Sequence, residues 1–173
     1  YADFYPVTEG LDRTLEHLRE AKRQGYSIAI FPEGTRSPDC SLLRFRRGAF
    51  FLAEQLNMDL LPVVLHGTGH VLPKQDFMLR RGSIHVRVLP RITPAYTRFG
   101  TDHIARARPL RQFYRAEYEA LCRRVETPAY FADLVLHNYI YKGPSVERAV
   151  RHALRQHDNY TAEISALPDS GEV

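Results

Sequence analysis

Long hydrophobic runs are missing from this sequence of 173 residues, although hydrophobic residues make up 44% of it. The longest apolar stretches, such as residues 60–65, are far shorter than the roughly 20 residues that cross a bilayer, and nothing resembles a signal peptide. The chain is nevertheless long enough to bury one ordinary core. We therefore expect a soluble chain with one compact domain and an appendage.

Cysteine is also scarce, because only Cys40 and Cys122 occur. Neither the number of cysteines nor their spacing suggests a disulfide framework or a zinc site. The sequence therefore predicts no metal and favours a reducing, cytoplasmic setting.

The whole chain has a net charge of +4, and acidic residues are few in two of its stretches. In the first, a single acid, Asp39, lies among four arginines: Arg36, Arg44, Arg46 and Arg47. The second holds Arg106, Arg108, Arg111 and Arg115. Nucleic acid, phospholipid headgroups and phosphate-bearing metabolites all suit such charge, and a solvated basic face explains the second stretch equally well.

The first half of the chain alternates helix and strand patterns. Apolar residues recur at helical spacing over residues 8–24, and residues 26–31 form a short apolar, β-prone run. The same order repeats with a helix at 48–56 and a strand at 60–65. Such repeats predict an α/β fold with a mainly parallel sheet flanked by helices.

Beyond residue 73 the pattern changes. Alternating apolar and polar residues at 83–89 predict an antiparallel edge strand, and further helices are predicted at 109–125, 127–140 and 145–158. Pro109 suits the first turn of its helix. We therefore divide the chain into an α/β domain at 1–105 and a helical extension at 106–173.

Residues 31–37, Phe-Pro-Glu-Gly-Thr-Arg-Ser, carry the chemistry. They follow a predicted strand, where open α/β sheets place their ligands. Gly34 permits close approach of a ligand, Thr35 offers a hydroxyl and a backbone donor, and the planar fork of Arg36 suits phosphate oxygens. Glu33 is placed to orient Arg36 or to accept a substrate hydroxyl. A polar turn with a surface ion pair is the plainer alternative.

This stretch resembles the third motif of the glycerol-3-phosphate and 1-acylglycerol-3-phosphate (lysophosphatidic acid) acyltransferase family. The resemblance implies that Glu33, Gly34, Thr35 and Arg36 bind the phosphate and glycerol of the acyl acceptor. Leu-Pro-Val-Val at 61–64 is similar to the family's fourth motif, which places Pro62 in the acceptor pocket.

Arg46 and Arg47 resemble the short basic segment that follows the third motif in this family. They are either accessory contacts to an anionic headgroup or donor, or simply solvated. The resemblance as a whole covers roughly residues 1–92.

Members of this family transfer the acyl group with a His and an Asp separated by four residues, upstream of the third motif. The His takes the proton of the attacking hydroxyl, and the carboxylate orients the imidazole. None of the eight histidines has an Asp five positions on. We therefore expect the catalytic pair upstream in a longer protein, and no catalytic residue here. The stretch His66-Gly67-Thr68-Gly69-His70 is predicted as a loop.

The resemblance implies an enzyme that moves a fatty acyl group from acyl-CoA or acyl-carrier protein to a lysophospholipid or glycerol-phosphate hydroxyl. It implies no bound cofactor, no nucleic acid, and work as a peripheral protein at the cytoplasmic face of a membrane. An exposed sheet edge predicts pairing with a second chain to form a dimer. The alternative is a non-enzymatic basic module that binds anionic lipid or nucleic acid.

The last third of the chain needs a separate explanation. Residues 138–144, a basic helix and Asn159-Tyr160 resemble the helical lead-in of some S-adenosylmethionine-dependent methyltransferases. The resemblance implies a linker to a further domain. Equally, these helices complete the acyltransferase domain by covering its sheet.

Overall fold

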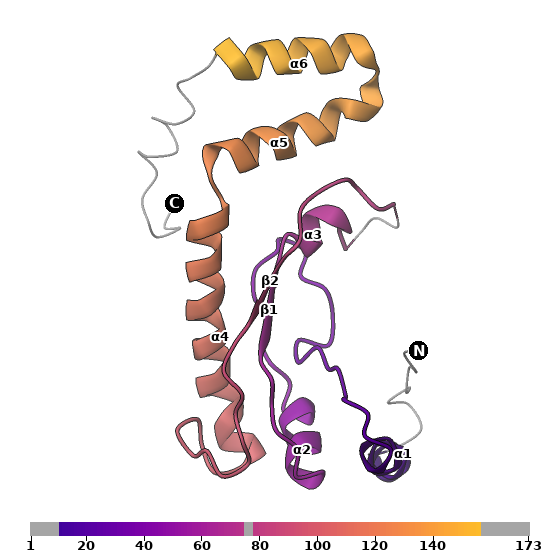
Figure 1. The fold of residues 1–173 in the computed structure, drawn as a ribbon, viewed down its shortest axis with the longest axis vertical. Coiled ribbons are helices and arrows are strands. Elements are labelled where there is room, and N and C mark those ends of the chain that lie inside the picture. Colours follow the sequence, from indigo (N-terminus) through magenta and orange to yellow (C-terminus); the bar gives the residue numbers. More distant parts are fainter. Residues whose placement is uncertain (1–10, 75–77, 157–173) are drawn as a thin grey trace.

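The computed structural model describes residues 11–74 and 78–156. Its elements are α1 (Leu11–Arg23), α2 (Gly48–Gln55), β1 (Val63–His66), α3 (Thr68–Val71), β2 (His85–Val88), α4 (His103–Val125), α5 (Pro128–Tyr139), the 3₁₀ helix η2 (Ile140–Lys142) and α6 (Pro144–Gln156). Figure 1 shows α4 lying along the β1–β2 pair, with α1 at one end of the molecule and α5 and α6 at the other. None of the described helices combines the length and the apolar character that a bilayer span requires.

The sheet of the described residues is a two-stranded antiparallel pair. Val63 of β1 lies opposite Val88 of β2, and His66 lies opposite His85. This confirms the antiparallel strand predicted at 83–89. The parallel pairing predicted for the first half of the chain is not seen in the described part.

The run at 26–31 was expected to be a buried parallel strand, and that prediction is wrong for the described structure. The run is not assigned to a strand, and Tyr26 and Phe31 are 60% and 73% exposed. Its apolar character predicted burial, but the described residues place no strand beside it to pair with.

The two faces of the sheet differ. Residues directly opposite in an antiparallel pair share a face, so Leu65 and Val86 lie on the same side as Val63 and Val88. Val86 and Val88 are 59% and 61% exposed. On the other side, Val64 is buried against Leu121 of α4. The sheet therefore has one face covered by α4 and one open apolar face.

Helix α4 belongs to two of the three apolar clusters. Its Leu110 packs with Phe45, Phe50 and Ile92, and its Leu121 packs with β1. The third cluster joins α1 to α2. The boundary expected between residues 105 and 106 thus falls inside α4, and the packed core extends through this helix.

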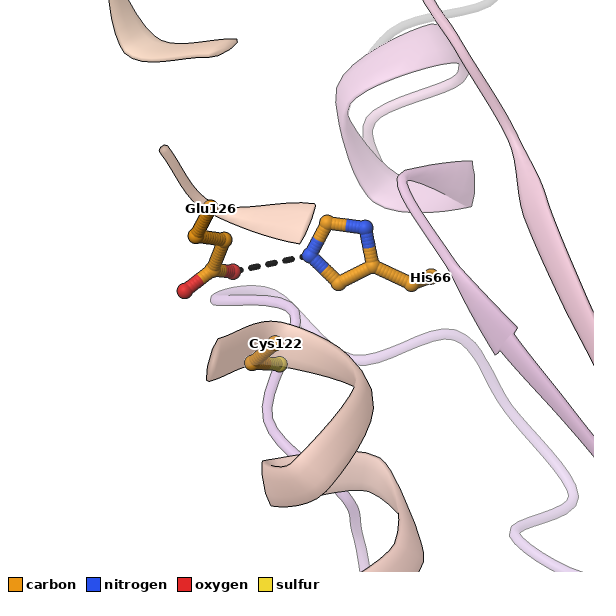
Figure 2. A group of neighbouring side chains, drawn as sticks. All are labelled: His66, Cys122 and Glu126. Atoms are coloured by element: carbon orange, nitrogen blue, oxygen red, sulfur yellow. Dashed lines mark hydrogen bonds and ion pairs between the residues drawn. The ribbon is translucent and has the colours of Figure 1, made fainter. Parts of the chain in front are cut away.

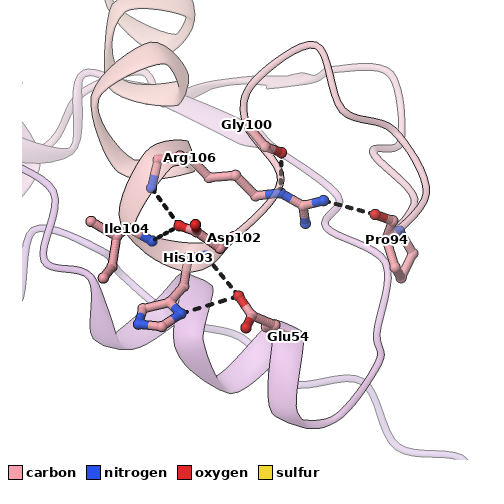
Figure 3. A network of polar contacts seen from close by, with 8 residues as sticks. Glu54, Pro94, Gly100, Asp102, His103, Ile104 and Arg106 are labelled. Atoms are coloured by element: carbon pink, nitrogen blue, oxygen red, sulfur yellow. Dashed lines mark hydrogen bonds and ion pairs between the residues drawn. The ribbon is translucent and has the colours of Figure 1, made fainter.

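The start of α4 differs from the prediction. The Asp102 side chain accepts hydrogen bonds from two backbone N–H groups of the first turn, both at 2.8 Å, and so caps the helix. The Glu54 carboxylate of α2 accepts the His103 N–H at 2.6 Å (Figure 3). The helix therefore begins at His103, and Pro109, expected in the first turn, lies inside it.

Arg106 is buried, which its place in a basic stretch did not predict. Its Nε donates to the Gly100 carbonyl at 3.0 Å and its Nη2 to the Pro94 carbonyl at 2.7 Å (Figure 3). The guanidinium thus fastens the 94–100 loop to α4.

The other helices follow the sequence pattern. The predicted helix at 48–56 is confirmed as α2, and α5 starts at Pro128 with Thr127 as its cap. Where a loop was predicted after β1, α3 forms a single helical turn. Gly67 precedes it at φ +87°, and a Cβ there would clash with the Ser83 carbonyl oxygen, so only glycine fits.

Some predictions fall outside the described residues. These are the helix start at Thr8, the helix end near Asp158, and the Asn159-Tyr160 pair of the methyltransferase resemblance. The methyltransferase link stays a prediction.

The packing of α4 on β1 makes Leu121→Ala a strong test of the fold. Leu121 is fully buried, and removing its side chain should lower the free energy of unfolding by about 2–5 kcal/mol. Urea unfolding followed by circular dichroism measures this loss. The control Leu61→Ala removes a side chain that is 53% exposed and should change stability by about 0.5 kcal/mol or less. Equal losses would mean that α4 does not pack as described.

Candidate functional site

The 31–37 loop is shaped around Gly34. This glycine has φ +71°, and a Cβ on it would lie 2.8 Å from Nε of Arg46. The Arg46 backbone N–H also donates to the Pro32 carbonyl at 2.7 Å. The missing side chain of Gly34 therefore lets the exposed Arg46 side chain lie against the loop, and its role as an accessory anion contact stays a prediction.

Glu33 connects the loop to the segment that follows it. One oxygen of its carboxylate, Oε2, accepts the Leu43 backbone N–H at 2.7 Å. Leu43 is in turn held by Arg111 of α4, whose Nε donates to the Leu43 carbonyl at 3.0 Å. Glu33 thus anchors the loop, and its other oxygen, Oε1, is still able to accept a hydrogen bond from a ligand.

Arg36 reaches across to the segment that follows α3. Its Nη1 donates to the carbonyls of Leu72 and Pro73 at 3.2 and 3.1 Å, and its Nη2 donates to that of Lys74 at 3.4 Å. A guanidinium has five N–H donors, so these three bonds leave donors for an oxyanion. In the described part of the chain, Arg36 bonds to these carbonyls and not to Glu33.

The remaining predicted residues differ in position. Thr35 is exposed on the loop, and Arg47 is exposed at the start of α2. Pro62 lies just before β1 with a fully buried side chain. Its role in the acceptor pocket stays a prediction, since here its ring is part of the packed interior.

Asp39, the single acidic residue of this basic stretch, accepts hydrogen bonds from its sequence neighbours. Asp39 Oδ1 accepts the hydroxyls of Ser37 and Ser41 at 2.6 and 2.7 Å, together with the Ser41 backbone N–H. These bonds, led by the two hydroxyls, lower the pKa of Asp39 from 3.8 to about 2. Asp39 therefore closes its own turn and is not paired with the arginines by these contacts.

The site therefore holds two guanidinium groups: that of Arg46 lies against Gly34, and that of Arg36 is held by the carbonyls that follow α3. Such groups bind phosphate or carboxylate oxygens through charge-assisted hydrogen bonds. The structure thus brings together Glu33, Gly34, Thr35, Arg36 and Arg46, and it places Pro62 in the interior.

A second polar cluster escaped the sequence analysis. His66 at the end of β1 lies 2.8 Å from Glu126 just after α4, and Cys122 lies one helical turn before Glu126 (Figure 2). The i, i+4 spacing of Cys122 and Glu126 put them on one helix face. Nothing in the sequence indicated that His66 would join them.

Comparisons with known proteins agree on one family. The protein-family model described as Acyltransferase matches residues 7–66. A 1-acyl-sn-glycerol-3-phosphate acyltransferase of Chlamydomonas reinhardtii is 34% identical over 83 residues, which cover 47% of this chain and 25% of that protein. The human 1-acyl-sn-glycerol-3-phosphate acyltransferase alpha is 39% identical over 67 residues, 39% of this chain and 24% of that protein.

A solved structure supports the same relation. The crystal structure of the 1-acyl-sn-glycerophosphate (LPA) acyltransferase PlsC from Thermotoga maritima is similar with a TM-score of 0.52 and 25% sequence identity. The match covers 68% of this chain and 47% of that chain. The chain thus spans about a quarter of the length of the curated relatives it matches and about half of the solved one.

The bonds to Asp39 predict how the loop responds to acid. Because folding lowers this pKa, the carboxylate stabilises the folded chain above its ordinary pKa, and the contribution disappears as the pH falls toward about 2. Replacing Ser37 and Ser41 together by Ala should return the pKa toward 3.8. NMR titration of the Asp39 carboxyl carbon measures it. The control Ser27→Ala should leave it low, and an unchanged pKa in the double variant would contradict the assignment.

Proposed function

We propose that this chain, whose residues 7–66 match the family model described as Acyltransferase, is part of a glycerolphospholipid acyltransferase and binds its acyl acceptor. The reaction would move a fatty acyl group from a thioester to a hydroxyl of glycerol phosphate or a lysophospholipid such as lysophosphatidic acid. One observation carries the proposal: the exposed Arg46 side chain lies against Gly34, close in sequence to Arg36, within the stretch that the family model matches.

Each residue of the loop has a role in this proposal. The donors of Arg36 that remain after its carbonyl bonds take phosphate oxygens, and Arg46 adds a second positive charge from its position against Gly34. Glu33 accepts a glycerol hydroxyl with the oxygen that does not bind Leu43. A ligand that carries both phosphate and hydroxyl groups uses all three side chains.

Acyl transfer also needs a base that takes the proton of the attacking hydroxyl. The expected His and Asp, separated by four residues, are not present in this sequence. We therefore expect this chain alone to bind the acceptor without transferring an acyl group. The donor, acyl-CoA or acyl-carrier protein, would be a cosubstrate of the whole enzyme.

The open apolar surfaces support a larger sheet in the whole protein. Within residues 26–31, the side chains of Tyr26, Ile30 and Phe31 are exposed, and the open face of β1 and β2 carries Val86 and Val88. Both are suited to pairing and packing with further strands in a mainly parallel sheet. The proposal also includes that the whole protein works at the cytoplasmic face of a membrane. It further includes that the protein forms a dimer through a free sheet edge.

The non-enzymatic basic module is less well supported by the contacts. It requires the arginines of the second basic stretch to be free for a polyanion. However, Arg106 is buried, Arg111 donates to the carbonyls of Leu42 and Leu43, and Arg115 pairs with Glu119. Arg106 and Arg111 therefore serve the fold, whereas the surface pair with Glu119 leaves the Arg115 side chain exposed.

Titration calorimetry tests the proposed function. Glycerol 3-phosphate, or a short-chain lysophosphatidic acid kept below its micelle concentration, should bind saturably, and Arg36→Ala should weaken binding about tenfold or more. The expectation follows from the roughly 1.5–3 kcal/mol of a hydrogen bond to a charged group. The control Arg108→Ala removes an exposed charge of the second stretch and should leave binding within about twofold.

Two results would count against the proposal. If both variants lost affinity equally and binding fell steeply with salt, the basic module would be favoured. If the folded wild-type chain bound neither ligand, acceptor binding by this chain would be ruled out.

A further inference from the structure

The junction of β1, α3, α4 and α5 gathers donor atoms of three kinds. His66 is 2% exposed, and its Nε2 lies 2.8 Å from Oε1 of Glu126. One ligand atom each from His66, Cys122 and Glu126 lies within 4.8 Å of the other two. Figure 2 shows the three side chains between the end of β1 and the last turn of α4. A nitrogen, a sulfur and an oxygen atom thus lie close together.

These three donors form a ligand set for a borderline-soft divalent cation. Zinc binds His nitrogen, Cys thiolate and carboxylate oxygen at about 2.0–2.3 Å, so neighbouring ligand atoms of a tetrahedral site are roughly 3.3–3.7 Å apart. The observed spacing, within 4.8 Å, requires side-chain shifts of about 1 Å. Ca²⁺ and Mg²⁺ prefer all-oxygen sites and fit less well.

The charge and burial of the cluster also favour a cation. The Glu126 side chain is partly buried beside the fully enclosed ring of His66. A divalent cation at this position would compensate the negative charge of the carboxylate and bind the cysteine as its thiolate.

The second ring nitrogen of His66 does not show whether the site is metal-free or metal-bound. Its Nδ1 is buried and has no hydrogen-bond partner among the described residues. It lacks one whether Nε2 donates to Glu126 or binds a metal. The test must therefore come from the three ligand atoms.

We propose that His66, Cys122 and Glu126 form a binding site for one Zn²⁺ ion, with water as the fourth ligand. The thiol proton of Cys122 passes to the solvent when its sulfur binds the metal. The ion links the end of β1 to the end of α4, at the base of α3. The chain leads from α3 directly to the carbonyls that hold Arg36. The role is structural, and it is independent of the proposed acyltransfer.

Cobalt substitution tests the site directly. The chain, stripped of metal with a chelator, is titrated with Co²⁺, and a thiolate-to-cobalt charge-transfer absorption in the near ultraviolet reports coordination by cysteine. We expect the band to saturate at one equivalent. Added Zn²⁺ should abolish the band and raise the melting temperature.

Matched cysteine variants identify the ligand. Cys122→Ser should remove the absorption band and weaken Zn²⁺ binding at least tenfold. The control Cys40→Ser changes the other cysteine and should leave the band and the Zn²⁺ affinity unchanged. Glu126→Gln, which is nearly identical in shape, should also weaken Zn²⁺ binding. It tests the ligand set if Cys122→Ser does not fold. Absence of the band from the wild-type chain, a band that persists in Cys122→Ser, or equal affinity in all variants would overturn the proposal.

Discussion

The packing of α4 against β1 and the 40–46 segment is the constraint on which the rest of this chain depends. Leu121 fills the space under β1, and Leu110 packs against Phe45. Polar contacts follow the same surface, since Tyr118 donates to the Cys40 carbonyl at 2.9 Å and Arg111 donates to two carbonyls of the 40–46 segment. Apolar burial supplies the free energy, and the hydrogen bonds fix the position of that segment.

The position of the 40–46 segment in turn fixes the candidate site. Its Leu43 amide binds Glu33, and its Arg46 lies against Gly34. The loop is thereby held on one side by a segment fastened to α4. On the other side, Arg36 is held by the carbonyls that follow α3. A loop fixed on both sides presents its guanidinium groups in a defined arrangement, which lowers the entropic cost of binding an anion.

Local signals predicted local structure well. Apolar periodicity and capping residues located α2, β2 and α5 because those features act within a few residues. The prediction that α4 begins near Pro109 was wrong because the cap at Asp102 and the contact from Glu54 extend the helix. The buried strand predicted at 26–31 was wrong because burial of a strand depends on neighbours that no local pattern specifies.

The candidate site was predictable only in part. A short motif placed Glu33, Gly34 and Arg36 on one loop, and the structure places Arg46 against Gly34. The motif could not show that Glu33 and Arg36 bond to different segments of the backbone. The His66–Cys122–Glu126 cluster was not predictable from spacing, because its members come from elements far apart in the sequence.

The central claim is that the 31–37 loop and Arg46 bind the phosphate of an acyl acceptor. The most direct measurement is the change in backbone and arginine side-chain NMR signals when glycerol 3-phosphate is added to the isotope-labelled chain. The account predicts saturable changes at Gly34, Thr35, Arg36 and the guanidinium of Arg46, with small changes along α4 and α6. Changes spread over the exposed arginines of those helices, with none at Gly34, would contradict it.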